Sequence, residues 1–143
     1  MFRLFLISLI LVSSVFSQEW EICDKTIDYE LTLQNVTISP DPPRVGRDVT
    51  IKLEGELIKI VDGGSVNILI KYDGTTIYNR ESELCSDPDD FPCPHPQGKV
   101  KFHKSLQIPS FAPAGTYSGQ ISITDQDNDA PIICFKYDMP VVN

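Results

Sequence analysis

The sequence predicts an all-β protein, an antiparallel β-sandwich of seven or eight short strands. Three observations support this prediction. Apolar residues recur at every second position through most of the chain, and helical periodicity is almost absent. Turn-forming residues interrupt the pattern roughly every ten residues. The 143 residues, 41% of them apolar, suffice for one core and one domain.

The charge of the chain excludes one large class of function. Twelve Lys and Arg residues against 20 Asp and Glu residues give a formal charge of −8. Nucleic-acid binding needs a positive surface that displaces counterions from phosphate, so no nucleic acid is expected as a partner. The apolar content is also too high for an intrinsically disordered chain.

In the first half of the chain, residues 27–33 alternate between apolar and polar, which predicts a half-buried strand. The phase then slips by one residue, so we expect a bulge or a break near Asn35. Residues 39–43 contain three prolines and should form an irregular connection, because proline cannot donate to a sheet ladder. Alternation resumes over residues 49–60, which predicts the next strand.

In the second half, turns are expected at residues 62–64 and at Asp73-Gly74. Tyr117 opens a late strand after a Pro-Ala-Gly turn, as in a tyrosine corner. The position two residues after it is Gly119, so the inter-sheet disulfide of antibody domains is absent. The strands of this half are expected at residues 66–72, 75–84, 100–108, 117–123 and 132–142.

Residues 1–17 have the features of a cleavable secretory signal peptide. Arg3 precedes an apolar run, and small residues stand at Val15 and Ser17. The alternative is a membrane anchor, but the run is shorter than the roughly 18–20 residues that span a bilayer. Cleavage would leave a single domain, residues 18–143, with a charge of −9. No later segment could span a membrane, so we expect a soluble protein that is secreted or resides in the endolysosomal lumen.

The even number of cysteines favours two disulfides in a secreted domain, and four cysteines allow three pairings. Cys85 and Cys93 flank a stretch rich in Pro and Asp that a short bridge would close into a loop. This choice leaves Cys23 with Cys134, near the two ends of the mature chain. Chain-entropy estimates are roughly 2.6 kcal/mol for the small loop and just under about 5 kcal/mol for the large one.

The sequence offers little for catalysis or for metal binding. The spacing of Cys85, Cys93, His95 and His103 matches no usual zinc pattern, and an oxidising route makes free thiolates unfavourable. No nucleophile elbow, zincin motif or phosphate-binding loop is present. We therefore expect neither an enzyme nor a metal or cofactor site.

Two further polar features of the sequence are an aspartate-rich segment and a glycosylation sequon. Residues 125–129 alternate aspartates as calcium loops do, but the sixth position is Ala130 and the twelfth is Lys136, so a polar turn is the better prediction. Asn35-Val36-Thr37 is a glycosylation sequon, and we expect Asn35 to be a glycosylation site.

Residues 99–104 form the one cationic cluster of this acidic chain. Strand alternation places Lys99 and Lys101 on one face and Phe102 on the other, with Lys104 on the inward phase. The simpler interpretation is a solvated outer face beside an acidic strand. The functional interpretation is that Lys99, Lys101 and Lys104 contact an anionic lipid headgroup or membrane surface.

Taken together, these motifs and cysteines resemble the ML lipid-recognition domain family. The resemblance covers nearly all of residues 20–142. It is closest to the phosphatidylglycerol/phosphatidylinositol transfer proteins and more distant from the Niemann-Pick type sterol carrier. The segments that carry it are residues 20–23, 38–46, 49–51, 55–57, 93–94, 113–117, 123–127 and 134–135.

The resemblance implies an immunoglobulin-like sandwich of two sheets that holds a lipid between them. It also implies the bridges Cys23–Cys134 and Cys85–Cys93, and it places the stretch 86–92 near the mouth of the slot. Because a closed core would show the same alternation, periodicity alone does not distinguish cavity from core. The residues expected to line the slot are Ile68, Ile70, Tyr72, Phe102, Tyr117, Ile121, Ile123, Ile133, Phe135 and Tyr137.

The leading hypothesis is a monomeric carrier that binds one lipid and transfers it between membranes without covalent chemistry. Phosphatidylglycerol or phosphatidylinositol is the first expected ligand, and a sterol is the second. Phe111, between two prolines, is expected either to touch the membrane during exchange or to cover the end of the sandwich. The rival classes are an immunoglobulin-like protein-interaction module and, third, a small hydrolase.

Overall fold

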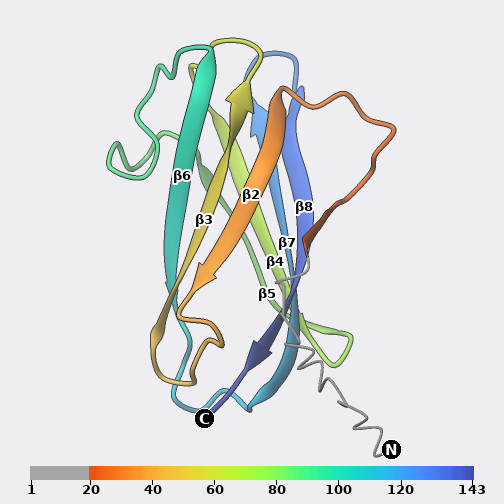
Figure 1. Cartoon of the computed structure of the whole chain (residues 1–143), viewed down its shortest axis with the longest axis vertical. Helices are drawn as coiled ribbons and strands as arrows, with labels where there is room; N and C mark the ends of the chain where they lie inside the picture. Colours follow the sequence, from red (N-terminus) through yellow and green to blue (C-terminus); the bar gives the residue numbers. More distant parts are fainter. Residues whose placement is uncertain (1–19) are drawn as a thin grey trace, which may run out of the picture.

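The computed structural model describes residues 20–143, and these residues form eight strands and no helix (Figure 1). The expected signal peptide therefore lies outside the described residues. Within them, no helix is long and apolar enough to cross a membrane. The strands are β1 (Trp20–Ile22), β2 (Leu31–Ser39), β3 (Asp48–Leu57), β4 (Gly64–Tyr72), β5 (Thr75–Glu83), β6 (Gly98–Gln107), β7 (Gly115–Asp125) and β8 (Pro131–Val141).

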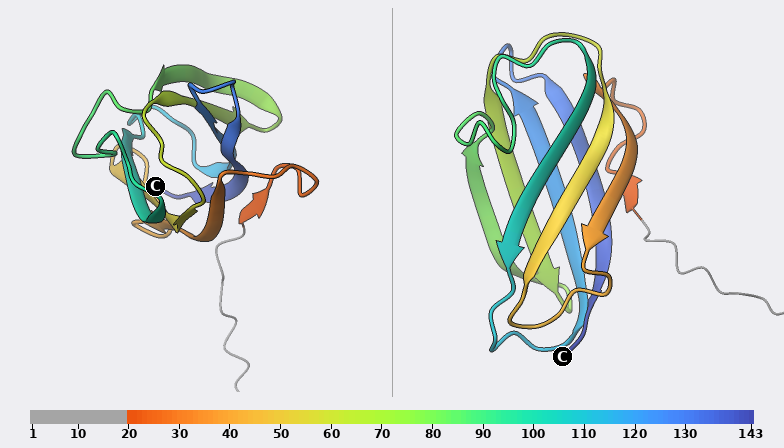
Figure 2. Two further views of the ribbon diagram at one scale, coloured as in Figure 1. Left: turned by 90° about the horizontal axis from the view of Figure 1, so that it is seen from above. Right: turned by 60° about the vertical axis from the view of Figure 1, so that its left-hand side comes forward.

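The strands form two sheets that face each other, as Figure 2 shows from two sides. One sheet has five strands in the order β1-β8-β7-β4-β5, and the other has three in the order β2-β3-β6. Every neighbouring pair is antiparallel. The predicted antiparallel sandwich is thus confirmed, with alternate side chains of each sheet directed into a shared interior.

Most predicted strands are present, but the first begins later than expected. The segment from Ile27 to Glu30 lies outside β2, because Asp24 holds the preceding residues in a turn. Its carboxylate accepts hydrogen bonds from the Thr26 amide at 2.9 Å and from the Thr26 hydroxyl at 2.6 Å. The predicted irregularity near Asn35 is confirmed, since the β2–β3 register shifts between Leu33 and Asn35.

The strand expected over residues 49–60 is also shorter than predicted. β3 ends at Leu57, and the side chains of Ile58 and Ile60 are 61% and 50% exposed. Alternation over these last residues therefore does not reflect a buried face. The predicted Asp73-Gly74 turn is confirmed as the two-residue hairpin between β4 and β5, with φ angles of 48° and 76°.

Backbone hydrogen bonds join the sheets at both ends of the sandwich. At the C-terminal end, the Val45 amide donates to the Val142 carbonyl and the Val142 amide donates to the Pro43 carbonyl, each at 2.9 Å. At the upper end of Figure 1, the Glu30 amide donates to the Pro131 carbonyl at 3.2 Å, and Val61 and His95 exchange backbone hydrogen bonds. We call this the closed end. The C-terminus, the β4–β5 hairpin and the β6–β7 connection lie at the opposite end, as the pairing of Tyr72 with Tyr117 and of Gly115 with Val141 requires.

Both predicted disulfides are present, Cys23–Cys134 and Cys85–Cys93. The second closes the loop between β5 and β6, drawn in green at the left of Figure 1. The loop starts and ends at the closed end and packs against β6, where the Phe91 and Phe102 rings are 6.1 Å apart. The expectation that residues 86–92 lie near the mouth of a slot is therefore wrong, because both flanking strands meet the loop at the opposite end.

Candidate ligand cavity between the sheets

A cavity of about 640 Å³ lies between the two sheets in the half of the sandwich away from the closed end. Both sheets supply its walls. The five-stranded sheet contributes Ile68, Ile70, Tyr72, Ile77, Tyr78, Tyr117, Gly119, Gln120, Ile121, Phe135, Tyr137, Met139 and Val141. The three-stranded sheet and the connection to β7 contribute Ile38, Val49, Ile51, Leu106, Gln107, Ile108, Pro109, Phe111, Ala112 and Pro113.

Two features of the strands leave this space unfilled. Gly119 occupies an inward position of β7, between Tyr117 and Ile121, and contributes no side chain to the interior. In addition, β5 pairs only with β4, and the smaller sheet has three strands against five. Inner side chains of β5, such as Tyr78, therefore line the cavity instead of packing into a closed core.

The structure divides the ten residues expected to line a slot into two groups. Phe102, Ile123 and Ile133 are not among the cavity walls and belong to the buried core, each no more than 6% exposed. They lie one row nearer the closed end, where Val66, Ile123 and Ile133 pair in register. The seven that line the cavity are Ile68, Ile70, Tyr72, Tyr117, Ile121, Phe135 and Tyr137.

Sequence reasoning missed the cavity residues of the three-stranded sheet, among them Ile38, Ile51 and Leu106. Their inward phase was visible in the alternation, but it gave no sign of which end of the sandwich was hollow. Ile77 was also missed, because it follows a polar hairpin on an edge strand whose residues are almost all exposed.

The cavity walls carry tyrosine hydroxyl groups but no Lys, Arg, Asp or Glu side chain. The Tyr117 hydroxyl donates to the Pro113 carbonyl at 2.6 Å, the hydrogen bond expected of a tyrosine corner. Burial, followed by the neighbouring Tyr72, raises the pKa of Tyr117. Burial and then Asp41 raise the pKa of Tyr137 to about 12. Both phenols therefore stay neutral at physiological pH.

The cavity opens between β5 and the β6–β7 connection, and we call this opening the mouth. Two apolar side chains that line the cavity also reach solvent here: Phe111 is 88% exposed and Ile77 is 55% exposed. Phe111 does not cover the end of the sandwich, because its ring is almost fully solvated. Exposed large apolar side chains beside an apolar cavity are typical of a surface that contacts something apolar.

The three lysines of the cationic cluster lie away from the cavity walls. Lys99 and Lys101 are exposed on the outer face of β6, where they pair in register with Glu56 and Glu54. The Lys101 ammonium is 3.9 Å from the Glu54 carboxylate. This geometry is that of a solvated outer face beside an acidic strand.

Lys104 is on the inward phase of β6 but is held by the disulfide loop. Its ammonium lies 3.4 Å from the Asp90 carboxylate, which also lies 3.3 Å from the His103 ring. The charge of Lys104 is therefore already partnered.

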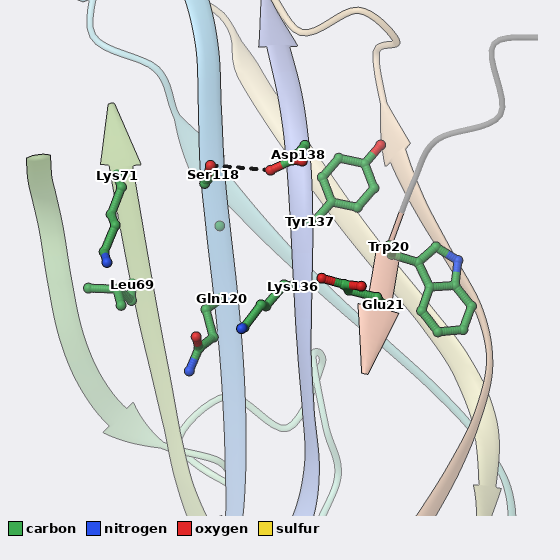
Figure 3. Close-up of a pocket in the computed structure, with 10 residues that line it drawn as sticks. Trp20, Glu21, Leu69, Lys71, Ser118, Gln120, Lys136, Tyr137 and Asp138 are labelled. Carbon is green, nitrogen blue, oxygen red and sulfur yellow. Dashed lines mark hydrogen bonds between the residues drawn. The ribbon is translucent and has the colours of Figure 1, made fainter. Parts of the chain in front are cut away.

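A second hollow, about 750 Å³, lies on the outer face of the five-stranded sheet (Figure 3). It is lined by outward-facing side chains of four strands, including Lys71, Gln120, Lys136 and Glu21. Ser118 donates a hydrogen bond to the Asp138 carboxylate at 3.2 Å across its floor. The walls of this second hollow are polar and open to solvent. The inter-sheet cavity is therefore the stronger candidate for an apolar ligand.

The fold agrees with the comparisons to known proteins. The family model described as "ML domain" matches residues 17–141. The chain belongs to the ML domain family.

Several proteins similar to this chain are named as transfer proteins. A Dictyostelium discoideum protein provisionally named phosphatidylglycerol/phosphatidylinositol transfer protein is 38% identical over 131 residues, 92% of each chain. The phosphatidylglycerol/phosphatidylinositol transfer protein of Pyricularia oryzae is 32% identical over 101 residues, which cover 68% of this chain and 57% of that protein.

Solved structures show the same fold at low sequence identity. A Niemann-Pick type C2 protein from the Japanese carpenter ant superposes with a TM-score of 0.68 at 14% identity, covering 86% of this chain and 98% of that one. Chicken MD-1, solved as a complex with lipid IVa, gives a TM-score of 0.55 at 13% identity and covers 85% and 87%. These neighbours confirm the sandwich fold predicted from the sequence.

Proposed function

We propose that this chain binds one lipid in the inter-sheet cavity and transfers it between membranes, with phosphatidylglycerol or phosphatidylinositol as the first candidate ligand. The observation that carries the proposal is the apolar cavity of about 640 Å³ whose mouth bears the exposed side chains of Phe111 and Ile77. The names of the curated relatives support a phospholipid, and the Niemann-Pick type C2 neighbour makes a sterol the second candidate.

The walls determine how a lipid would be held. Burying apolar surface contributes roughly 25 cal/mol per Å², so acyl chains favour the cavity over water. A charged headgroup has no ionised partner on the cavity walls and would lose its hydration inside, so it remains at the mouth. Binding and release then require only that the mouth meets a bilayer, and no covalent step is involved.

The disulfides and the expected signal peptide also support a proposal about where the protein resides. Both disulfides fit folding in an oxidising compartment, which the expected signal peptide would provide. Asn35 is exposed on β2 and accessible to glycosylation. We propose a monomeric protein of the secretory pathway, in the endolysosomal lumen or outside the cell.

The first test is native mass spectrometry of protein purified from its own cells. We expect a mass excess of one phospholipid for each chain. A sterol mass would support the second candidate ligand. Lipid-free protein that also fails to bind lipid from vesicles would contradict the carrier and favour the protein-interaction module.

The second test fills the cavity at Gly119. A Cβ added there meets only the Tyr137 carbonyl oxygen at 3.7 Å, an ordinary contact, and Gly119 does not have a positive φ. Gly119→Phe should therefore fold while its ring occupies the cavity, and lipid transfer between vesicles should fall at least about tenfold. Gly119→Ala, the matched control, should transfer lipid normally. A folded Gly119→Phe protein that transfers lipid at the wild-type rate would refute the cavity as the binding site.

A further inference from the structure

Arg80 is a cation on β5, the strand that borders the mouth, and it lies beside a cavity residue. It lies two residues after Tyr78 on β5, so both side chains are on the same face of the strand. The Arg80 Cζ is 5.9 Å from the centroid of the Tyr78 ring, and Tyr78 lines the cavity. The guanidinium is thereby held beside the cavity while remaining exposed to solvent.

The charge of Arg80 is not neutralised by a carboxylate. Within residues 20–143, no Asp or Glu oxygen lies within 4.0 Å of its guanidinium, whereas Lys101 has Glu54 and Lys104 has Asp90. The neighbouring acid Glu81 alternates to the opposite face of β5. Arg80 is thus available to an anion that arrives at the mouth from outside.

The cavity itself offers an anion no partner, since its walls carry no cationic side chain. A phospholipid with its acyl chains in the cavity would leave its phosphate at the mouth. A guanidinium binds phosphate oxygens through two parallel hydrogen bonds, and stacking on a ring restricts the arginine before binding.

We propose that Arg80 is the specificity-determining residue for the headgroup and selects phospholipids with a net negative charge. This inference rests on the proposed function. In a zwitterionic lipid the quaternary amine offsets the phosphate charge, and a sterol has no phosphate. Arg80 therefore favours an anionic phospholipid over both.

The experiment compares transfer of fluorescent phosphatidylglycerol, phosphatidylcholine and cholesterol between vesicles by wild type, Arg80→Gln, Arg80→Lys and Lys101→Gln. We expect Arg80→Gln to slow phosphatidylglycerol transfer roughly three- to tenfold and to change the other two by less than about twofold. Arg80→Lys should be intermediate, because it keeps the charge and loses the two-pronged geometry. Lys101→Gln, on the outer face of β6, should match wild type.

Several outcomes would overturn the inference. Equal slowing for all three lipids would assign Arg80 a structural role, and an unchanged preference for phosphatidylglycerol would assign it none. Binding of inorganic phosphate alone to the lipid-free protein, lost in Arg80→Gln, would make the ligand free phosphate. Failure of the wild type to transfer any lipid would instead contradict the proposed function, so the two failures are distinguishable.

Discussion

Among single residues, a buried acidic pair at the closed end stands apart from the apolar core. The Asp125 side chain is fully buried and that of Glu30 is 10% exposed, and one carboxyl oxygen of each has no hydrogen-bond partner among the described residues. The Lys59 ammonium lies 3.4 Å from the Glu30 carboxyl and 3.5 Å from the Asp125 carboxylate. Because Glu30 precedes β2 and Asp125 ends β7, the pair joins the two sheets.

The pKa values of the two carboxyl groups shift in opposite directions. Burial, and then the hydrogen bond and charge of Asp125, raise the pKa of Glu30. Burial also acts to raise the pKa of Asp125, but the Asp127 amide, Glu30 and Lys59 together hold it below its ordinary value. Glu30 therefore holds its proton to a higher pH than Asp125, whose negative charge faces Lys59.

These shifts predict how stability depends on pH. A lowered pKa contributes stability above the ordinary pKa of Asp125, and this part is lost as the pH falls through the lowered pKa. A raised pKa contributes stability below the ordinary pKa of Glu30, and this part is lost as the pH rises through the raised pKa. The pair should therefore stabilise the fold most in mildly acidic solution.

Substitutions at this pair should have unequal effects. Glu30→Gln places an amide donor beside the Asp125 carboxylate, so it should cost about 1 kcal/mol or less and should reduce the loss of stability as the pH rises through the raised pKa of Glu30. Asp125→Asn removes the buried negative charge that Lys59 faces and should cost about 2–3 kcal/mol. Urea unfolding over a series of pH values from acidic to neutral measures these differences. Equal costs for the two variants would contradict the opposite pKa shifts of Glu30 and Asp125.

Among the structural elements, the mouth is built from an edge strand and a connection. Ile77 belongs to β5 and Phe111 to the segment between β6 and β7, and each exposes apolar surface beside the cavity. Ile58 and Ile60, between β3 and β4, are comparably exposed but lie at the closed end. The chain thus contains a matched pair of exposed apolar sites at its two ends.

This arrangement predicts that only one of the two sites matters for transfer. The double variant Ile77→Ser, Phe111→Ser should slow lipid transfer between vesicles by roughly tenfold, because less apolar surface enters the bilayer. The double variant Ile58→Ser, Ile60→Ser should transfer lipid at the wild-type rate. Transfer rates from fluorescent donor vesicles provide the measurement, and equal slowing by both variants would exclude the mouth as the docking surface.

For the whole molecule, the two disulfides constrain the chain to different extents. Cys23–Cys134 spans 111 positions and ties β1 to β8, whereas Cys85–Cys93 spans eight and closes one loop. Replacing Cys23 and Cys134 by Ser should lower the free energy of unfolding by just under about 5 kcal/mol, and the same change at Cys85 and Cys93 by roughly 2.6 kcal/mol. Denaturant unfolding of the two double variants tests the order, and a larger loss from the short loop would contradict it.

Much of this architecture was predictable because strand formation follows a local pattern. Alternation placed β4, β6 and β7 near their observed bounds, because one face of each strand packs against the protein interior while the other faces water. It failed at Ile27, where a turn held by the Asp24 carboxylate overrides the pattern, and at Ile60, which stays exposed.

The sequence by itself determined the sandwich, the phase of its strands, the two disulfides and the family. The tertiary structure decided which inward side chains face a cavity and which fill the core. Ile121 and Ile123 have the same phase, yet only Ile121 lines the cavity. It also placed Arg80 beside the cavity residue Tyr78 and the disulfide loop at the closed end. The physical reason is that alternation records only which face of a strand is inward, whereas a cavity depends on the distance between two sheets built from residues far apart in the chain.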